Sequence, residues 1–401
     1  MSVSAIAGGI TAAEGFTSAG VAAGIKASGA LDVTLIVADR PASVAAVFTT
    51  NQVQAAPVLV SRGHVTASGG TARAVIVNSG CANACTGAQG LATTRATVAE
   101  VAALVGCPVD QVLVSSTGVI GVHLPVDKVV RGARAAFAAL SRDGHTAARG
   151  IMTTDTSPKE FAVRVDTPAG AFHVGGIAKG AGMIEPMMAT MLAFVTTDAA
   201  VPPALLARAL REVTGRTFNA ITVDGECSTN DTFVALASGS SGVVIDEGSY
   251  GTLVEGLEAV ARALALAIVR GGEGATKLVA VHVTGADSDA DAMRAAKTIA
   301  NSPLVKTAIH GADPNWGRLV SATGRSGARF VLEHARVQVG SIVLFTNGQP
   351  YDDQAPAAAT YLRQSELEVH VDLGTGGDGH AVAWTCDLSA EYVRINGEYR
   401  T

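Results

Sequence analysis

The chain of 401 residues is long enough for two or three domains and for a core that is stable without disulfides. Its net charge is −6, only 16% of its residues are charged, and no block of Lys and Arg occurs, so nucleic acid is not an expected partner. The first basic residue is Lys26, which leaves the amino terminus without the basic flank of a signal peptide. The most apolar helical stretch, 253–269, carries Glu255, Glu258 and Arg262, which interrupt a membrane span. These features predict a soluble, cytoplasmic protein.

The apolar periods predict a mixed chain of strands and helices. In the first half, the expected strands cover 33–37, 45–48, 74–77 and 112–114, and the expected helices lie near 92–105 and 127–140. In the second half, the expected elements are a helix opened by Pro202 and Pro203, a helix over about 251–270, a strand over 278–283 and a helix over about 289–300. Beyond Ser321 we expect mostly strands, joined by short turns such as that at Asn347 and Gly348. A boundary near 284–288 then leaves a smaller, mostly β domain from about 285 to 401.

A glycine pattern between two expected strands matches the GxGxxG motif of dinucleotide-binding proteins. Its glycines, Gly374, Gly376 and Gly379, lie between alternating strands over 368–372 and 381–385, and no helix follows them. This context predicts a hairpin turn and no dinucleotide site. The phosphate-loop pattern GxxxxGK[ST] is also absent from the sequence.

Cysteine and histidine spacing indicates neither a disulfide framework nor a metal site. The five cysteines are an odd number in a long chain, and Cys81 and Cys85 are followed by no histidine at a zinc-finger distance. The nine histidines are scattered singly, and no HExxH pair occurs. We therefore expect no metal and no cofactor.

The step from Ala189 to Thr190 is the candidate reacting centre. A threonine is a weak nucleophile, but a cut before Thr190 would give it a free α-amino group that can act as its base. The same sequence is also consistent with a structural role, in which Thr190 is a hydroxyl residue at the start of an apolar strand over 191–195. The residues at this step leave both interpretations open.

Eight separated segments, in their order along the chain, resemble one enzyme family. They are 78–86, 115–118, 152–159, 179–192, 227–232, 272–277, 304–307 with 313–317, and 392–401. The family is that of the ornithine acetyltransferases, also called glutamate N-acetyltransferases, of cyclic arginine biosynthesis. The resemblance extends from Gly24 to Thr401 and implies an enzyme that moves acetyl from N2-acetylornithine to glutamate.

The resemblance also implies self-cleavage between Ala189 and Thr190. The products would be an α chain of residues 1–189 and a β chain of residues 190–401. Thr190 would then attack the acetyl carbonyl, with its own amino group as the base, and carry the acetyl group as an ester.

Two residues of the segment 115–118 match the oxyanion donors of the family. They are Thr117, through its hydroxyl, and Gly118, through its backbone amide. Their setting agrees, because a short strand over 112–114 is expected to end in a sharp turn at 115–118, as a nest of donors requires.

Substrate recognition requires charges opposite to an α-carboxylate and, for ornithine, opposite to a cationic side chain. The positions that match the substrate-binding residues of the family are Thr153, Lys179, Thr190, Glu273, Asn396 and Thr401. Glu273 could pair with the δ-ammonium of ornithine, and the last two residues belong to a carboxyl-terminal tail that must fold back over the site. Thr154 adjoins Thr153, so the register at this position is open.

The fold implied by the resemblance is a layered α/β sandwich, similar to the amino-terminal-nucleophile hydrolases but wired differently. Members of the family assemble as dimers of α and β pairs, so an α2β2 assembly is expected. The composition by itself predicts only a mixed α/β class.

Three alternatives to simple acetyl recycling remain. The first is a bifunctional enzyme that also uses acetyl-CoA as donor. The second is a hydrolase, because an aminopeptidase family shares this sandwich and its self-cleavage, although its nucleophile is normally serine. The third is a non-catalytic remnant, which the presence of a nucleophile, an oxyanion pair and charged substrate residues disfavours.

Overall fold

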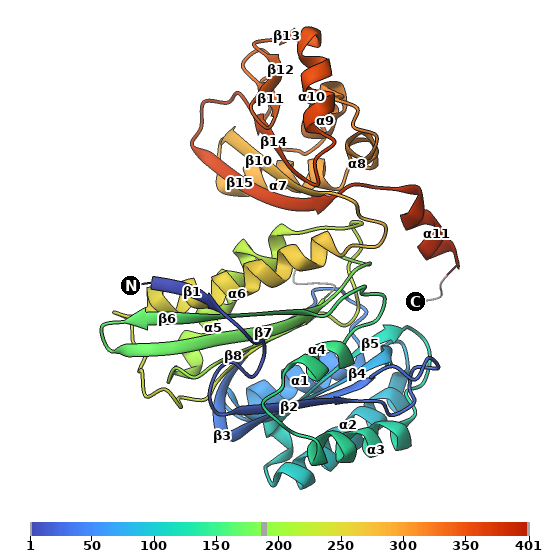
Figure 1. The fold of residues 1–401 in the computed structure, drawn as a ribbon, viewed down its shortest axis with the longest axis vertical. Helices are drawn as coiled ribbons and strands as arrows, with labels where there is room; N and C mark the ends of the chain where they lie inside the picture. Colours follow the sequence, from blue (N-terminus) through green and yellow to red (C-terminus); the bar gives the residue numbers. More distant parts are fainter. Residues whose placement is uncertain (1, 186–190, 399–401) are drawn as a thin grey trace. The chain divides into compact units, whose positions relative to one another are not determined.

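The computed structural model describes residues 2–185 and 191–398, and these form two compact units (Figure 1). The first unit holds the described residues up to Asn219 together with Glu226–Ile268. The second holds Ala220–Gly225 and the described residues from Val269 onward. Among the helices that the structure describes, none combines the length and the apolar character needed to cross a membrane.

A large mixed sheet forms the centre of the first unit. In the described residues its order is β1-β6-β7-β8-β9-β3-β4-β5, with β2 paired to β3. The strands are β1 (Ser2–Ile6), β2 (Phe16–Val21), β3 (Val33–Phe48), β4 (Thr71–Cys81), β5 (Val112–Val119), β6 (Lys159–Thr167), β7 (Gly170–Lys179), β8 (Leu192–Thr197) and β9 (Thr232–Ala237). Every residue of β8 and β9 is buried, as expected for neighbouring parallel strands that are covered on both faces.

Helices and loops cover both faces of this sheet (Figure 1). The helices are α1 (Ala56–Ala67), α2 (Gly87–Val105), α3 (Val126–Ala138), α4 (His145–Gly150), α5 (Pro203–Arg216) and α6 (Tyr250–Arg270), with short 3-10 turns η1 (Val109–Gln111) and η2 (Phe218–Ala220). Successive residues of β7 face opposite sides of the sheet and so contact different layers. Gly176 faces Val260 of α6, whereas Gly175 faces the backbone of Gly9. A Cβ on Gly175 would lie 2.0 Å from the Gly9 oxygen, so only glycine permits this approach. The predicted layered α/β fold is confirmed.

A second mixed sheet forms the centre of the second unit. In the described residues its order is β13-β12-β11-β14-β10-β15. The strands are β10 (Leu278–Ala286), β11 (Arg336–Val339), β12 (Ile342–Thr346), β13 (Gln349–Pro350), β14 (Glu366–Asp372) and β15 (Gly379–Cys386). The helices are α7 (Asp289–Ala300), α8 (Pro303–His310), α9 (Trp316–Gly324), α10 (Ala355–Tyr361) and α11 (Ala390–Glu398), with η3 at Asp352–Gln354. The core packs α7 to α10 against one face of the sheet through Val281, Ala296, Ile299 and Val369.

The prediction of a hairpin at the glycine-rich segment between β14 and β15 is wrong. These two strands are not neighbours, because β10 lies between them and pairs with both. Residues 373–378 therefore cross the end of β10, and Gly377 approaches the backbone of Ala286 there. The alternating patterns on either side of the glycines were correctly identified as strands, but a local pattern does not reveal that a third strand is inserted between them.

Two further expectations differ from the structure. The strands predicted over 33–37 and 45–48 are parts of one strand, β3, whose pairing with β4 shifts between Val37 and Ala42. The sharp turn predicted at 115–118 does not form, because β5 continues through these residues to Val119.

Candidate active site

The predicted oxyanion donors lie at the carboxyl end of β5, beside the end of the parallel strand β4. Thr117 pairs with Ser79 and Gly118 pairs with Gly80, and both predicted donors are partly exposed. Gly118 has φ +125°, and a Cβ there would lie 2.4 Å from the carbonyl carbon of Gly80. The close approach of the two strands therefore requires glycine at this position.

Asn230 connects this strand end to the start of β9. Its Nδ2 donates to the main-chain oxygens of Ala82 (2.7 Å) and Ser116 (2.9 Å). Its Oδ1 accepts from the hydroxyl of Thr229 at 2.6 Å. Because Asn230 is buried, these bonds fix the residue that precedes Thr117.

The proposed nucleophile lies outside the described residues, as does Ala189 before it. The described chain resumes at Met191 and enters β8, where Leu192 pairs with Lys179 of β7 on one side and with Thr232 of β9 on the other. The segment that follows the proposed cleavage point is therefore held between the ends of these two strands.

Lys179 and Thr153 share one buried partner, Asp155. The backbone N–H of Thr153 donates to Asp155 Oδ2 at 3.0 Å, and Lys159 Nζ donates to Oδ1 at 2.5 Å. The N–H of Gly180, directly after Lys179, also donates to Oδ1, at 2.7 Å. Lys179 itself is only 8% exposed, which is unusual for a lysine without a binding or structural role.

The charges around Asp155 decide its protonation. Burial by itself would raise the pKa of this carboxyl, but the charges of Lys179 and Lys159 and the hydrogen bonds it accepts lower the pKa from 3.8 to about 2. Lys26 lies in the same field, and burial lowers the pKa of its ammonium although Asp32 and Asp155 oppose that shift. The first unit thus contains two buried lysines, Lys159 and Lys179, and the partly buried Lys26 around one ionised carboxylate.

Glu273 and Asn396 meet within the second unit. Asn396 Nδ2, on α11, donates to Glu273 Oε2 at 2.8 Å, and Glu273 is only 6% exposed. The loop that carries Glu273 is fixed by Asp387, which accepts from the backbone N–H groups of Thr276 (2.8 Å) and Lys277 (2.9 Å). Thr401, the last predicted substrate residue, lies outside the described residues.

Three buried side chains in this region were given no role by sequence reasoning. Asp155, Asn230 and Asp231 all lie inside segments that carry the family resemblance, 152–159 and 227–232. The only sequence feature that could have pointed to these three residues is their position inside segments that resemble the family. Their spacing does not reveal that each is buried and makes contact with a strand end.

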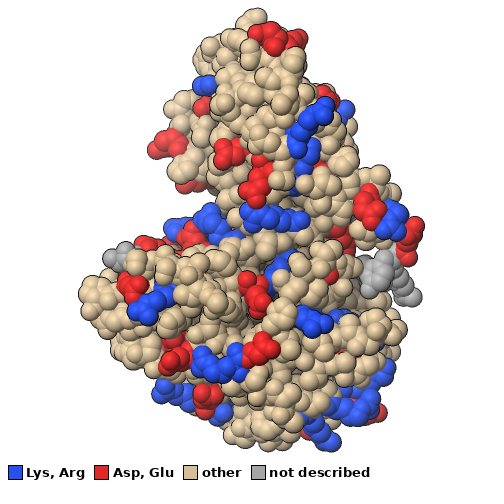
Figure 2. Space-filling view, in the orientation of Figure 1, with Lys and Arg blue, Asp and Glu red and all other residues tan. Residues whose placement is uncertain are grey.

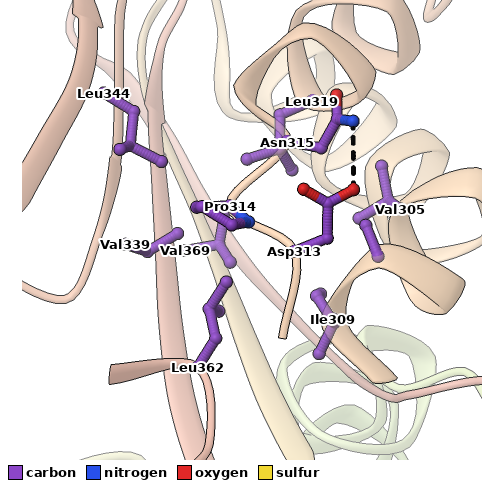
Figure 3. A pocket seen from close by; sticks show the side chains of 11 residues that line it. Val305, Ile309, Asp313, Pro314, Asn315, Leu319, Val339, Leu344, Leu362 and Val369 are labelled. Atoms are coloured by element: carbon purple, nitrogen blue, oxygen red, sulfur yellow. Dashed lines mark hydrogen bonds between the residues drawn. The ribbon is translucent and has the colours of Figure 1, made fainter. Parts of the chain in front are cut away.

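Two other features, the charged surface of the protein and an apolar pocket in the second unit, do not indicate a different active site. Figure 2 shows Lys and Arg interspersed with Asp and Glu on the visible face. In the pocket of Figure 3, apolar side chains such as Val305 and Leu362 surround Asp313, which accepts from Asn315 Nδ2 at 3.2 Å. None of the predicted site residues lines this pocket.

The fold and the buried polar site define a layered α/β protein with a candidate acyl-transfer centre. The ArgJ family matches residues 17–401, and the chain belongs to this family. The arginine biosynthesis bifunctional protein ArgJ of Geobacter sulfurreducens is 50% identical over 394 residues, which cover 97% of this chain and 99% of the relative. The predicted family and the prediction of an acetyltransferase enzyme are confirmed.

Two solved structures are similar to this chain. The arginine biosynthesis bifunctional protein ArgJ of Bacillus halodurans is 43% identical with a TM-score of 0.51, and the match covers 52% of this chain and 100% of that one. An ornithine acetyltransferase of Mycobacterium tuberculosis, solved in complex with ornithine, is 44% identical with a TM-score of 0.43, and the match covers 47% of this chain and 100% of that one.

Proposed function

We propose that this enzyme transfers acetyl from N2-acetylornithine to glutamate in arginine biosynthesis, through an acetyl ester on Thr190. One observation carries the proposal: Asn230 is bonded to the strand end that bears Thr117, and it lies two residues before Thr232, the first residue that pairs with β8, the strand after Thr190. The residues 230–232 thus contact both the strand that carries the predicted oxyanion donors and the strand that follows the predicted nucleophile.

The proposed reaction begins after cleavage between Ala189 and Thr190. The Thr190 hydroxyl oxygen attacks the acetyl carbonyl, and its proton passes to the free α-amino group of the same residue. Thr117 and Gly118 donate to the oxyanion that forms. The carbon–nitrogen bond then breaks, and ornithine leaves with the proton. In the second half of the cycle the amine of glutamate attacks the ester carbonyl and loses a proton to the α-amino group of Thr190. The ester carbon–oxygen bond then breaks, the Thr190 oxygen regains a proton, and N-acetylglutamate leaves.

Charge complementarity supports the proposed substrate contacts. Lys179 is a buried cation suited to an α-carboxylate, and Thr153 is held beside it through Asp155. Glu273 is a buried anion suited to the δ-ammonium of ornithine, and Asn396 orients its carboxylate. Thr401 is proposed as a further contact on the basis of its match to the family.

We propose that maturation produces chains of residues 1–189 and 190–401, and that the carboxyl-terminal subdomain predicted from about 285 is part of the second unit, which also includes the residues from Val269. An α2β2 assembly in the cytoplasm follows from the resemblance. Relatives of this chain are named bifunctional, which favours acetyl-CoA as an additional donor as the second candidate function.

Mass spectrometry of the purified protein tests both the cleavage before Thr190 and the role of Thr190 as the residue that carries the acetyl group. We expect two fragments divided before Thr190, and one added acetyl group on the peptide that begins at Thr190 after incubation with N2-acetylornithine alone. The Thr190→Ala variant should remain near 40.3 kDa and transfer no acetyl. An efficiently cleaved or active alanine variant would remove Thr190 from both roles.

A further inference from the structure

A fully buried carboxyl group lies next to the strand that follows the proposed nucleophile. Asp231 is 3% exposed and directly precedes β9, where the N–H of Thr232 donates to the oxygen of Met191 at 3.1 Å. The Asp231 carboxyl accepts hydrogen bonds from the backbone N–H of Met191 and from the hydroxyl of Ser228. Its Oδ2 has no hydrogen-bond partner among the described residues.

Asp231 and Asp155 lie near the same cation, Lys179, but their pKa values are shifted in opposite directions. Burial raises the pKa of Asp231 well above its ordinary value, and the charge of Lys179 does not reverse that shift. Asp155 has two lysines and three N–H or ammonium donors around it, so its pKa falls to about 2. The pKa values of the two carboxyl groups are therefore shifted in opposite directions within the same unit, a pattern typical of catalytic sites.

We propose that Asp231 is a positioning residue for Thr190, because its carboxyl group holds the backbone N–H of Met191. Met191 is the first residue after the proposed nucleophile, so a bond to its N–H fixes the start of the described segment that leads into β8. Burying Oδ2 without a hydrogen-bond partner among the described residues is costly for a purely structural role, because an unsatisfied buried polar atom destabilises a fold. This inference rests on the proposed function of Thr190.

The test compares Asp231→Asn with Asp231→Ala in the full chain. The amide keeps the shape and an oxygen that can accept from the N–H of Met191, so Asp231→Asn should retain both self-cleavage and kcat. The alanine variant loses the bond to Met191, and a misplacement of about 1 Å typically costs on the order of 100-fold in rate. We therefore expect Asp231→Ala to lower kcat about 100-fold with little change in KM, and to slow cleavage as measured by intact mass.

Rates are expressed per folded and cleaved molecule, counted from the gel-filtration peak of the folded protein and the cleaved fraction in its intact mass, so that a folding defect is not mistaken for a catalytic one. Exposed Asp246→Asn serves as the matched control. An alanine variant with normal cleavage and kcat per folded molecule would overturn the positioning role, and so would an asparagine variant as slow as the alanine variant. A wild-type chain that neither cleaves nor becomes acetylated would instead overturn the proposed function.

A separate observation concerns three side chains on one face of the second sheet. His282 of β10 pairs in register with His370 of β14, and Glu368 lies two residues before His370 on the same face. One nitrogen or oxygen atom from each lies within 4.8 Å of the others. The two imidazole rings are stacked, with centroids 4.5 Å apart and planes inclined by 12°.

The polar atoms of this cluster are incompletely satisfied by protein. His370 Nε2 lies 3.2 Å from Glu368 Oε2, but His282 Nε2 is buried and has no hydrogen-bond partner among the described residues. Two imidazoles and one carboxylate are the donors of a three-ligand zinc site with an open fourth position. We propose that His282, Glu368 and His370 bind one zinc ion, with rotation of the rings bringing the donor atoms to about 2.0–2.2 Å from it.

Calorimetric titration of zinc chloride into the chelator-treated full chain tests this site. We expect one ion per chain, and no binding at that site in the double variant His282→Ala with His370→Ala. The control is His380→Ala, an exposed histidine of the same unit. Absence of binding, or binding that the double variant retains, would overturn the zinc site.

Discussion

Asn230 donates from Nδ2 to the main-chain oxygen of Ser116 at 2.9 Å, and Ser116 directly precedes Thr117. The bond is buried and joins two segments that are 114 residues apart in the sequence. The placement of the predicted oxyanion donors therefore depends on a side chain that reaches them from the start of β9.

This dependence predicts the effect of Asn230→Ala. Loss of the two bonds leaves the main-chain oxygens of Ala82 and Ser116 buried without Asn230, which should lower the free energy of unfolding by about 1–3 kcal/mol. We expect kcat to fall on the order of 100-fold because the donors shift. Steady-state kinetics and thermal unfolding measure the two effects, and Gln364→Ala, which removes an exposed side-chain amide, is the control. Unchanged kcat would show that Asn230 only stabilises the fold.

The hydroxyl of Thr117 is expected to act in the transition state. Removal of one oxyanion donor typically costs about 100- to 1,000-fold in turnover, so Thr117→Ala should lower kcat far more than it raises KM. The measurement requires fully cleaved protein, because the same donor could assist maturation. A raised KM with unchanged kcat would make Thr117 a ground-state binding residue.

The buried carboxylate of Asp155 predicts a pH-dependent loss of stability. Because folding lowers its pKa from 3.8 to about 2, its stabilising contribution is complete above about pH 4 and is lost as the pH falls toward 2. Asp155→Asn leaves Lys159 and Lys179 without this anion, so at pH 7 the variant should be about 3 kcal/mol less stable. Denaturant unfolding at pH 7 and near pH 2.5 should show the difference between variant and wild type shrinking at the lower pH. A difference that stays constant would mean that Asp155 is not ionised in the folded state.

Much of the fold was predictable from the sequence because it depends on local periodicity. The helices α6 and α7 and the alternating strands β14 and β15 lie close to where their patterns place them. The neighbours of a strand are set by distant segments, which explains why the insertion of β10 between β14 and β15 was missed. The same reason applies to Asp155, whose importance comes from Lys179, 24 positions away, and from the burial of both.

Glu273 provides a test of side-chain recognition. Glu273→Gln keeps the shape and removes the charge, so kcat/KM for N2-acetylornithine should fall by about 10- to 100-fold, the size expected for loss of one charged hydrogen bond. Use of N-acetylglutamate in the reverse direction should fall less, because glutamate has no δ-ammonium. Glu366→Gln, an exposed carboxylate paired with Arg270, is the matched control. Equal losses of kcat/KM for both substrates would mean that Glu273 stabilises its loop and does not bind the ornithine side chain.

The order in which substrates bind and products leave tests the proposed acetyl-Thr190 intermediate. An ester on Thr190 requires ornithine to leave before glutamate reacts, so double-reciprocal plots at several glutamate concentrations should be parallel. Intersecting lines together with an unacetylated Thr190 peptide would indicate direct transfer in a ternary complex, and Thr190 would lose its role as carrier. The same peptide also distinguishes the donors: acetylation by acetyl-CoA at a rate comparable to kcat would assign the bifunctional activity to this chain. If only N2-acetylornithine labels the peptide, the enzyme recycles acetyl and does not take it from acetyl-CoA.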